Sequence, residues 1–150
     1  MASWSDLERE APTIAAEGRR LLEARGHGEA FLATVRGDAA PRIHPISMAI
    51  VDGEVLAFII ENSPKYRDLE QDGRYAMHSH QEADAPDELA LRGRARLVTD
   101  VARRAAAMAI WSFEPDDTYG LFAFDVESAV LGQRGADEWP PRYTRWTSAR

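Results

Sequence analysis

Hydrophobic side chains recur with two different periods along the chain. Up to residue 25 they fall at the three-, four- and seven-residue spacings that keep side chains on one face of a helix. The positions are Leu7, Ile14, Leu21 and Leu22. A Ser-x-x-Glu capping box at residues 5–8 is expected to open this N-terminal helix. Because Pro12 weakens the first part, the firm helix is expected over residues 13–25, and Gly26 and Gly28 are expected to end it.

From residue 30 the period shortens to that of a β-strand. Segments rich in β-branched and aromatic residues predict six strands, at residues 30–35, 42–51, 55–60, 74–80, 89–98 and 119–131. The first three are expected to form an antiparallel meander, since an Asp-Gly pair at 52–53 suits a type I′ hairpin turn. Short helices are expected from residues 64 and 101, and a break in the last strand near Glu127. The pattern predicts a mainly β (α+β) fold, a small antiparallel barrel or curled sheet.

Length and composition fit one globular domain. The 150 residues are 45% hydrophobic and 29% charged, with no composition break. We expect a single domain over residues 1–150, with its core at about 29–131 and a C-terminal arm at 132–150. The arm carries Trp139 and Trp146 among Arg and Pro residues, a composition typical of interface anchors and of groups that stack on planar ligands. The alternative is an arm that simply packs on the barrel.

The charge balance and the cysteine count exclude several classes of protein. With 18 Lys+Arg against 25 Asp+Glu the net charge is -7, which argues against a nucleic-acid partner. The absence of cysteine excludes disulfides and thiolate chemistry. The longest apolar stretch, residues 55–60, is far shorter than a membrane span, and the N-terminus lacks a signal-peptide pattern. We expect a cytoplasmic protein with no membrane partner.

The start of the helix after residue 62 is the first candidate site. Ser63 suits the N-cap and Pro64 the first helical position, so the amides of the first turn carry the positive end of the helix dipole. A phosphate placed there accepts bonds from those amides and the Ser63 hydroxyl, with added charge from Lys65 and Arg67. The alternative is an ordinary cap beside a solvated lysine.

The predicted strand at residues 42–51 is the second candidate site. Arg42, His44 and Ile46 alternate onto one face, together with Met48. Pro45 has no amide hydrogen, which indicates an edge strand or an interrupted ladder whose free backbone groups can bind a ligand ring. The alternative is a plain surface edge with His44 on its solvated face.

Other chemistry has little support in the sequence. His78 and His80 share a face of a predicted strand, but zinc needs three or four ligands and no nearby motif supplies the rest, so no metal site is predicted. The G-x-S-x-G, H-E-x-x-H and G-x-G-x-x-G motifs are absent, which argues against hydrolytic chemistry and a Rossmann dinucleotide site.

The order of these segments resembles the pyridoxamine 5′-phosphate oxidase-like family, whose members are FMN-binding split β-barrels. The segments that carry the resemblance are residues 30–38, 41–46, 52–53, 63–69 and 89–95. It covers about residues 29–98, roughly half of the chain. It implies a six-stranded antiparallel split β-barrel with an N-terminal helix and short connecting helices, assembled as a homodimer with FMN sites at the interface.

The resemblance also implies roles for the two candidate sites. The strand from Arg42 to Ser47 is expected to lie along the flavin ring and ribityl chain, the end of the next strand near Ile60 to offer backbone contacts, and the Ser-x-Lys element to bind phosphate. The predicted cofactor-binding residues are Arg42, His44, Pro45, Ile46, Ser47, Ile60, Ser63, Lys65 and Arg67. No catalytic residue is predicted.

The chain departs from true pyridoxamine phosphate oxidases in the region of the substrate segment. An acidic loop at residues 81–87 and a helix from residue 101 occupy that region, so vitamin B6 oxidation is not carried over. Pro64 also stands where closer relatives have a basic residue. The expected function is an FMN-dependent oxidoreductase acting on an unspecified small molecule. The alternatives are a deazaflavin-dependent reductase and a non-enzymatic flavin or haem carrier or sensor.

Overall fold

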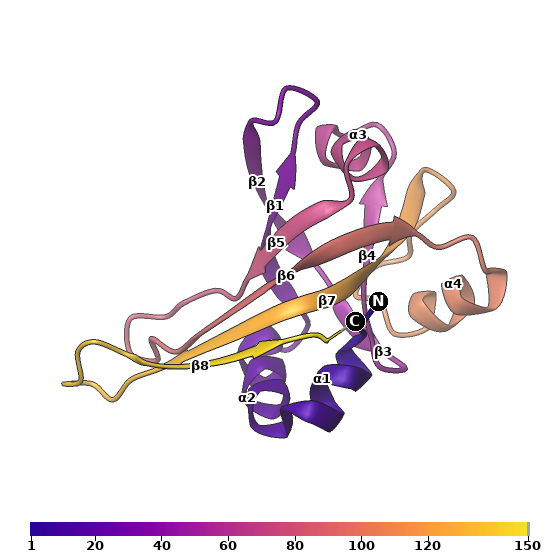
Figure 1. Cartoon of the computed structure of the whole chain (residues 1–150). Coiled ribbons are helices and arrows are strands. Elements are labelled where there is room, and N and C mark those ends of the chain that lie inside the picture. Colours follow the sequence, from indigo (N-terminus) through magenta and orange to yellow (C-terminus); the bar gives the residue numbers. More distant parts are fainter. Residues whose placement is uncertain (150) are drawn as a thin grey trace.

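The computed structural model describes residues 1–149, which form four helices and eight strands. The helices are α1 (Trp4–Glu10), α2 (Pro12–Leu22), α3 (Pro64–Gln71) and α4 (Val101–Met108). The strands are β1 (Glu29–Val35), β2 (Pro41–Ser47), β3 (Ala49–Val51), β4 (Glu54–Ile60), β5 (Arg74–His78), β6 (Glu88–Leu97), β7 (Tyr119–Gln133) and β8 (Arg142–Thr147). In Figure 1 the strands fill the centre, with α1 and α2 at one end and α3 at the other.

The eight strands form one antiparallel sheet that curls on itself. Their order is β2-β1-β5-β6-β7-β4-β3, and β8 pairs with β7. β2 and β3 stand at opposite ends of this order, yet only Met48 separates them in the chain. The sheet therefore curls until its two ends meet, which confirms the mainly β split-barrel fold.

The strand predicted at residues 42–51 is one bent strand. β2 pairs with β1 and β3 pairs with β4, so the predicted order of neighbours is correct. The strand passes from one edge of the sheet to the other at Met48, whose amide donates to the Gly28 carbonyl at 3.0 Å. Positive φ angles of 49° at Asp52 and 77° at Gly53 confirm the β3–β4 hairpin turn.

β7 is the longest strand and pairs with three others. Its pairing with β6 shifts between Arg92 and Gly93, which leaves Glu127 as an extra residue in a bulge and confirms the predicted break. The six predicted strands were too few, partly because β8 was missed. β8 lies on the edge of the sheet and is exposed along almost its whole length, so it lacks the alternation that marks a half-buried strand.

The N-terminal region forms two helices where one was expected. Ser3, and not Ser5, caps α1, since its hydroxyl accepts the Asp6 amide while the Asp6 carboxylate accepts the Ser3 amide at 2.8 Å. The Ser5 amide instead donates to the Gly53 carbonyl at 3.0 Å and docks α1 on the β3–β4 turn. Pro12 starts α2 as its first residue, because its missing amide hydrogen costs nothing there. α2 also ends at Leu22, three residues earlier than expected.

Two hydrophobic clusters hold the strands in place. The larger fills the barrel beneath α1 and α2 and includes the four helix residues chosen from their spacing: Leu7, Ile14, Leu21 and Leu22. The smaller lies between α4 and the β4–β7 pair, around Phe58 and Leu121. Within residues 1–149, no helix has the length and apolar character needed to cross a membrane.

Candidate functional site

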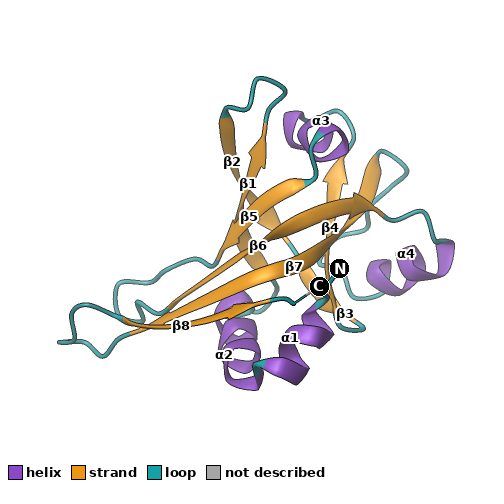
Figure 2. Ribbon diagram, viewed as in Figure 1, coloured by secondary structure: helices purple, strands orange, loops and turns teal. Residues whose placement is uncertain are grey.

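α3 begins directly after β4, at the same end of the barrel as the β1–β2 hairpin (Figure 2). The Ser63 hydroxyl accepts the Tyr66 amide at 3.3 Å and donates to the Ile60 carbonyl at 2.7 Å, which confirms the predicted N-cap. Pro64 has no amide hydrogen and Tyr66 uses its own on the cap, so the Lys65 amide is the first-turn donor still free for a ligand. Ser63 therefore shapes the turn, while Lys65 faces its open end.

Lys65 is the only lysine in the 150 residues. Its side chain is half-buried, and burial lowers the pKa of its ammonium group. Among the described residues no carboxylate forms an ion pair that would offset this burial. A half-buried cation without a partner favours an anionic ligand, because that ligand would supply the missing charge.

Arg42 reaches α3 from the neighbouring strand β2. Its Nε donates to Asp68 Oδ2 at 2.9 Å, and the Thr34 hydroxyl on β1 donates to the same oxygen at 2.7 Å. Asp68 is 5% exposed and Thr34 is 1% exposed. Burial alone would raise the pKa of Asp68, but the hydrogen bonds from Arg42 and Thr34 hold the pKa below its usual value. Because Asp68 takes only the Nε of Arg42, the two terminal nitrogens of the guanidinium remain available.

His44 lies next to these charges on the inner face of β2. Its Nε2 is buried and has no hydrogen-bond partner among the described residues. Burial lowers the pKa of His44, and the positive charges of Lys65 and Arg42 lower it further against the opposing effect of Asp68. The ring is therefore neutral at pH 7. A buried polar atom without a partner is costly unless a ligand satisfies it.

The structure thus gathers three of the predicted residues and places the others around them. Arg42, His44 and Lys65 belong to one polar cluster with Thr34 and Asp68, which we call the α3 cluster. Lys65 is half-buried and the Nε2 of His44 is buried, so neither side chain is fully solvated.

The remaining predicted residues lie outside the α3 cluster. Arg67 is exposed on α3, and Ile60 is 38% exposed at the end of β4. Pro45 is exposed on the outer face of β2, while Ile46 and Ser47 are half-buried farther along the strand. β2 is an end strand of the sheet order, so alternate backbone groups on its outer edge are not used by β1. This agrees with the edge strand that Pro45 indicated.

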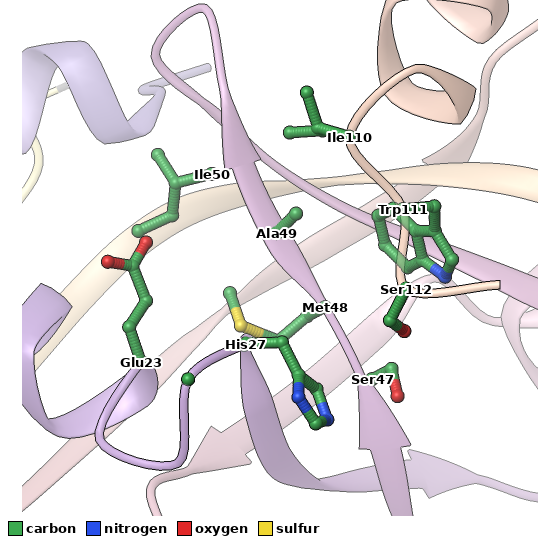
Figure 3. A pocket seen from close by; sticks show the side chains of 11 residues that line it. Glu23, His27, Ser47, Met48, Ala49, Ile50, Ile110, Trp111 and Ser112 are labelled. Carbon is green, nitrogen blue, oxygen red and sulfur yellow. The ribbon is translucent and has the colours of Figure 1, made fainter.

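A pocket of about 290 Å³ lies at the other end of β2, beside the bend at Met48 (Figure 3). Its walls come from the α2–β1 loop, the β2–β3 bend and the segment after α4. The lining residues are Glu23, Gly26, His27, Gly28, Ser47, Met48, Ala49, Ile50, Ile110, Trp111 and Ser112. Of the predicted residues, only Ser47 lines this pocket.

The two histidines near the end of β5 are engaged separately. The Nδ1 of His78 lies 2.6 Å from the Ser79 carbonyl, and the His80 ring packs against Phe31 with centroids 4.3 Å apart. β5 ends at His78, so the two side chains do not share a strand face. Within residues 1–149, no group of three or more His, Asp or Glu side chains is arranged to hold a metal ion.

Sequence reasoning missed Thr34, Asp68 and the residues around Trp111. Asp68 lies inside the segment that was singled out, but an aspartate on a short helix carries no signal of burial. Its position one turn after Lys65 and directly before the apolar Leu69 could have indicated an inward carboxylate. Trp111 follows α4 and meets β2 only through tertiary packing.

Comparisons with known proteins agree with this architecture. A model of the pyridoxamine 5′-phosphate oxidase family matches residues 16–129. A haem-binding protein from Mycobacterium smegmatis superposes with a TM-score of 0.68 at 17% identity; the match covers 88% of this chain and 57% of that one. General stress protein 26 from Bacillus anthracis gives a TM-score of 0.62 at 17% identity, covering 85% of this chain and 98% of that one.

An F420 reductase is also similar in fold, with a TM-score of 0.58 at 21% identity, covering 75% of this chain and 94% of that one. No curated protein matches the chain. At these identities the solved structures support the fold, whereas the family match rests on sequence over most of the chain. The chain belongs to the pyridoxamine 5′-phosphate oxidase-like family.

Proposed function

We propose that the protein binds FMN, with the phosphate at the α3 cluster and the ring system along β2 toward Ser47, and acts as an oxidoreductase on a small molecule. The observation that carries this proposal is the half-buried Lys65, which has no acidic partner. It lies near His44, whose buried Nε2 has no hydrogen-bond partner. Both features suit a phosphate, which supplies negative charge and several acceptor oxygens at one point.

Each residue of the α3 cluster has a definite role in this proposal. Lys65 supplies a positive charge and a free backbone amide at the positive end of α3. Arg42 supplies its two terminal nitrogens, with its direction fixed by Asp68. The neutral His44 offers Nε2 as a hydrogen-bond partner. Arg67, exposed on the same helix, adds long-range attraction and no fixed contact.

The edge of β2 would hold the rest of the cofactor. Backbone groups from His44 to Ser47 that β1 does not use are free to bond the ribityl chain and the ring. Flavin supplies hydride transfer when bound, and the protein supplies binding, orientation and exclusion of water. This division of labour explains why no side-chain acid or base stands out in the sequence.

A homodimer with a cofactor site at the interface is part of the same proposal. On the outer face of β1 and β2, Ile43 is 69% exposed and Phe31 is 36% exposed. Large apolar side chains beside the candidate site suit burial against a second copy. The exposed Trp139 and Tyr143, which flank the start of β8, are candidates to complete the partner's ring pocket.

Titration of the purified protein with FMN tests the proposal. Quenching of flavin fluorescence should follow a saturable curve, and Lys65→Met should weaken binding by about 10- to 100-fold, since a charged hydrogen bond contributes about 1.5–3 kcal/mol. Arg92→Ala is the matched control, because it removes an exposed positive charge from β6, outside the α3 cluster. Equal FMN affinity of the two variants would rule out the phosphate assignment.

Parallel titrations separate the alternatives. A deazaflavin coenzyme also carries a phosphate and would use the same cluster, so its affinity is compared with that of FMN under identical conditions. Haem is the third arm, because one structural neighbour is a haem-binding protein. Reduction of bound FMN by nicotinamide donors distinguishes an oxidoreductase from a carrier or sensor, which would bind the cofactor without turnover.

A further inference from the structure

We infer that the pocket at the β2–β3 bend is the substrate site of this flavoprotein, and that it takes an uncharged or cationic planar organic molecule. The inference rests on the proposed function for its link to redox chemistry. The pocket itself is formed by one chain and has its own shape and charge (Figure 3).

The pocket lies at the opposite end of β2 from the α3 cluster. Ser47 ends β2 and also lines the pocket. From Arg42 to Ser47 an extended strand spans roughly 17 Å, which is comparable with the length of an extended flavin mononucleotide. A flavin anchored at the α3 cluster and laid along β2 therefore brings its ring to the mouth of the pocket.

The pocket has the size and walls of a site for a small planar molecule. Its volume of about 290 Å³ is at the lower end of small-molecule sites, enough for a compound of one or two rings. Met48 and Ile50 form apolar walls with Trp111, whose ring is held edge-to-face on Phe58 with centroids 4.9 Å apart. A fixed indole beside aliphatic side chains suits a flat ligand.

The pocket lining has an acidic character. No Arg or Lys lines the pocket, and its acidic residue is Glu23, which forms a long, exposed ion pair of 3.9 Å with Arg19 outside the lining. His27, also in the lining, has its Nε2 3.0 Å from a Glu29 carboxylate oxygen. A negatively charged rim disfavours phosphate- or carboxylate-bearing substrates and favours neutral or cationic ones. The two ends of β2 therefore select for opposite charges.

The wall of the pocket formed by the α2–β1 loop and the β2–β3 bend is preformed. The Gly28 carbonyl accepts the Met48 amide at 3.0 Å, and a Cβ on Gly28 would lie 2.0 Å from the Met48 carbonyl oxygen. Gly26 has a φ of +92°. Only glycine allows the loop to approach the bend this closely, so the pocket exists before a ligand arrives.

Three compounds of one shape and different charge test the inference: benzamidine, benzamide and benzoate. Calorimetric titration into the wild-type protein should give affinities that decrease in that order. Glu23→Gln should reduce the preference for benzamidine over benzamide by about threefold, the size of an exposed charge interaction. Glu114→Gln, which removes an exposed carboxylate outside the lining, should leave the preference unchanged.

A second variant adds a cation at the mouth of the pocket. Ile110 is 58% exposed, so Ile110→Arg should fold normally. The added cation should weaken the binding of benzamidine and strengthen the binding of benzoate. Benzamidine should also shift the absorption spectrum of FMN bound to the wild-type protein, because the two ligands would lie in contact.

The outcomes separate this inference from the proposed function. If FMN does not bind but benzamidine binds with the expected dependence on Glu23, the cofactor proposal fails and the ligand class of the pocket stands. If FMN binds and its absorption spectrum does not change when benzamidine is added, the substrate site lies elsewhere and the inference is overturned. Tighter binding of benzoate, or affinities that neither variant changes, overturns it as well.

Discussion

At the Arg42 end of β2, side chains make the site, whereas at the Ser47 end the backbone makes it. The α3 cluster depends on hydrogen bonds from Thr34 and Arg42 to Asp68, which fix the direction of the Arg42 guanidinium. The pocket depends on a loop that presses against the β2–β3 bend at Gly28. One end therefore offers positive charge in a fixed direction, and the other offers a preformed shape with one acidic side chain, Glu23, in its lining.

This difference indicates how one strand can serve two kinds of ligand group. A phosphate is the same in every flavin mononucleotide, so a few directed polar contacts are enough to hold it. Recognition of a substrate depends on walls, which loops can alter while the barrel stays constant. Changes at the two ends should therefore have different consequences for stability and binding.

The largest effect is expected from Gly28→Ala. The added Cβ would collide with the Met48 carbonyl, and because backbone cannot move aside cheaply, the free energy of unfolding should fall by about 3 kcal/mol. Urea denaturation measures the loss. Gly37→Ala is the control, since its Cβ meets only the Gln71 side chain at 3.7 Å and should change stability by less than about 1 kcal/mol. Similar values for both variants would show that the close approach at the bend is unimportant.

Asp68→Ala is expected to have the next largest effect. It leaves the buried Thr34 hydroxyl and the Arg42 guanidinium without their acceptor, which should cost about 2 kcal/mol of unfolding free energy. Because the folded pKa of Asp68 is lowered, its stabilisation is present above its ordinary pKa and is lost as the pH falls through the lowered value. Asp68→Asn should remove that part of the acid dependence in urea denaturation between pH 5 and pH 2. An unchanged acid profile in Asp68→Asn would contradict the interpretation.

Lys65→Met should affect stability in the opposite direction from Asp68→Ala. The substitution removes a half-buried charge that no acidic group balances, so the free energy of unfolding should rise slightly, by about 0.5 kcal/mol or less. The same variant should lose FMN affinity, as described above. Higher stability together with weaker FMN binding in this variant would indicate that Lys65 serves binding and not folding. A clear loss of stability would indicate a structural role.

The smallest effect is expected from the titration of His44. Its folded pKa is lowered by burial and by Lys65 and Arg42, so the unfolded chain binds a proton first as the pH falls. Stability without ligand should therefore decrease as the pH drops below about 6.5, the ordinary value of histidine, until the lowered pKa is reached. His44→Gln should abolish this component, whereas His27→Gln should retain it. The thermal midpoint between pH 7.5 and pH 5 measures the difference.

Much of the fold could be predicted because local patterns and tertiary structure agree. The turn at Asp52-Gly53, the Ser63 cap and the bulge at Glu127 each follow from residues close in sequence, and all three are present. The bend at Met48 was not predictable, since it depends on the Gly28 carbonyl twenty residues away. β8 was missed because an exposed edge strand carries no hydrophobic alternation.

The candidate site divides in the same way. Arg42, His44 and Lys65 were chosen from a strand and a helix start, and the structure brings them together. Asp68 and Thr34 were missed, because burial of a polar group is decided by its partners on other elements. The members of the α3 cluster on one strand and one helix start could be predicted, whereas the buried groups that orient Arg42 could not.

The bent β2–β3 strand joins the two edges of the sheet, and this has a consequence for the kinetics of opening. The two edges meet through this strand, so opening the barrel at this seam requires it to lift from β1 or from β4. Such an event would disperse the α3 cluster and the wall of the pocket together. A ligand lying along β2 should therefore slow amide hydrogen exchange from Pro41 to Val51 as one cooperative unit, with far less change in β6 and β7.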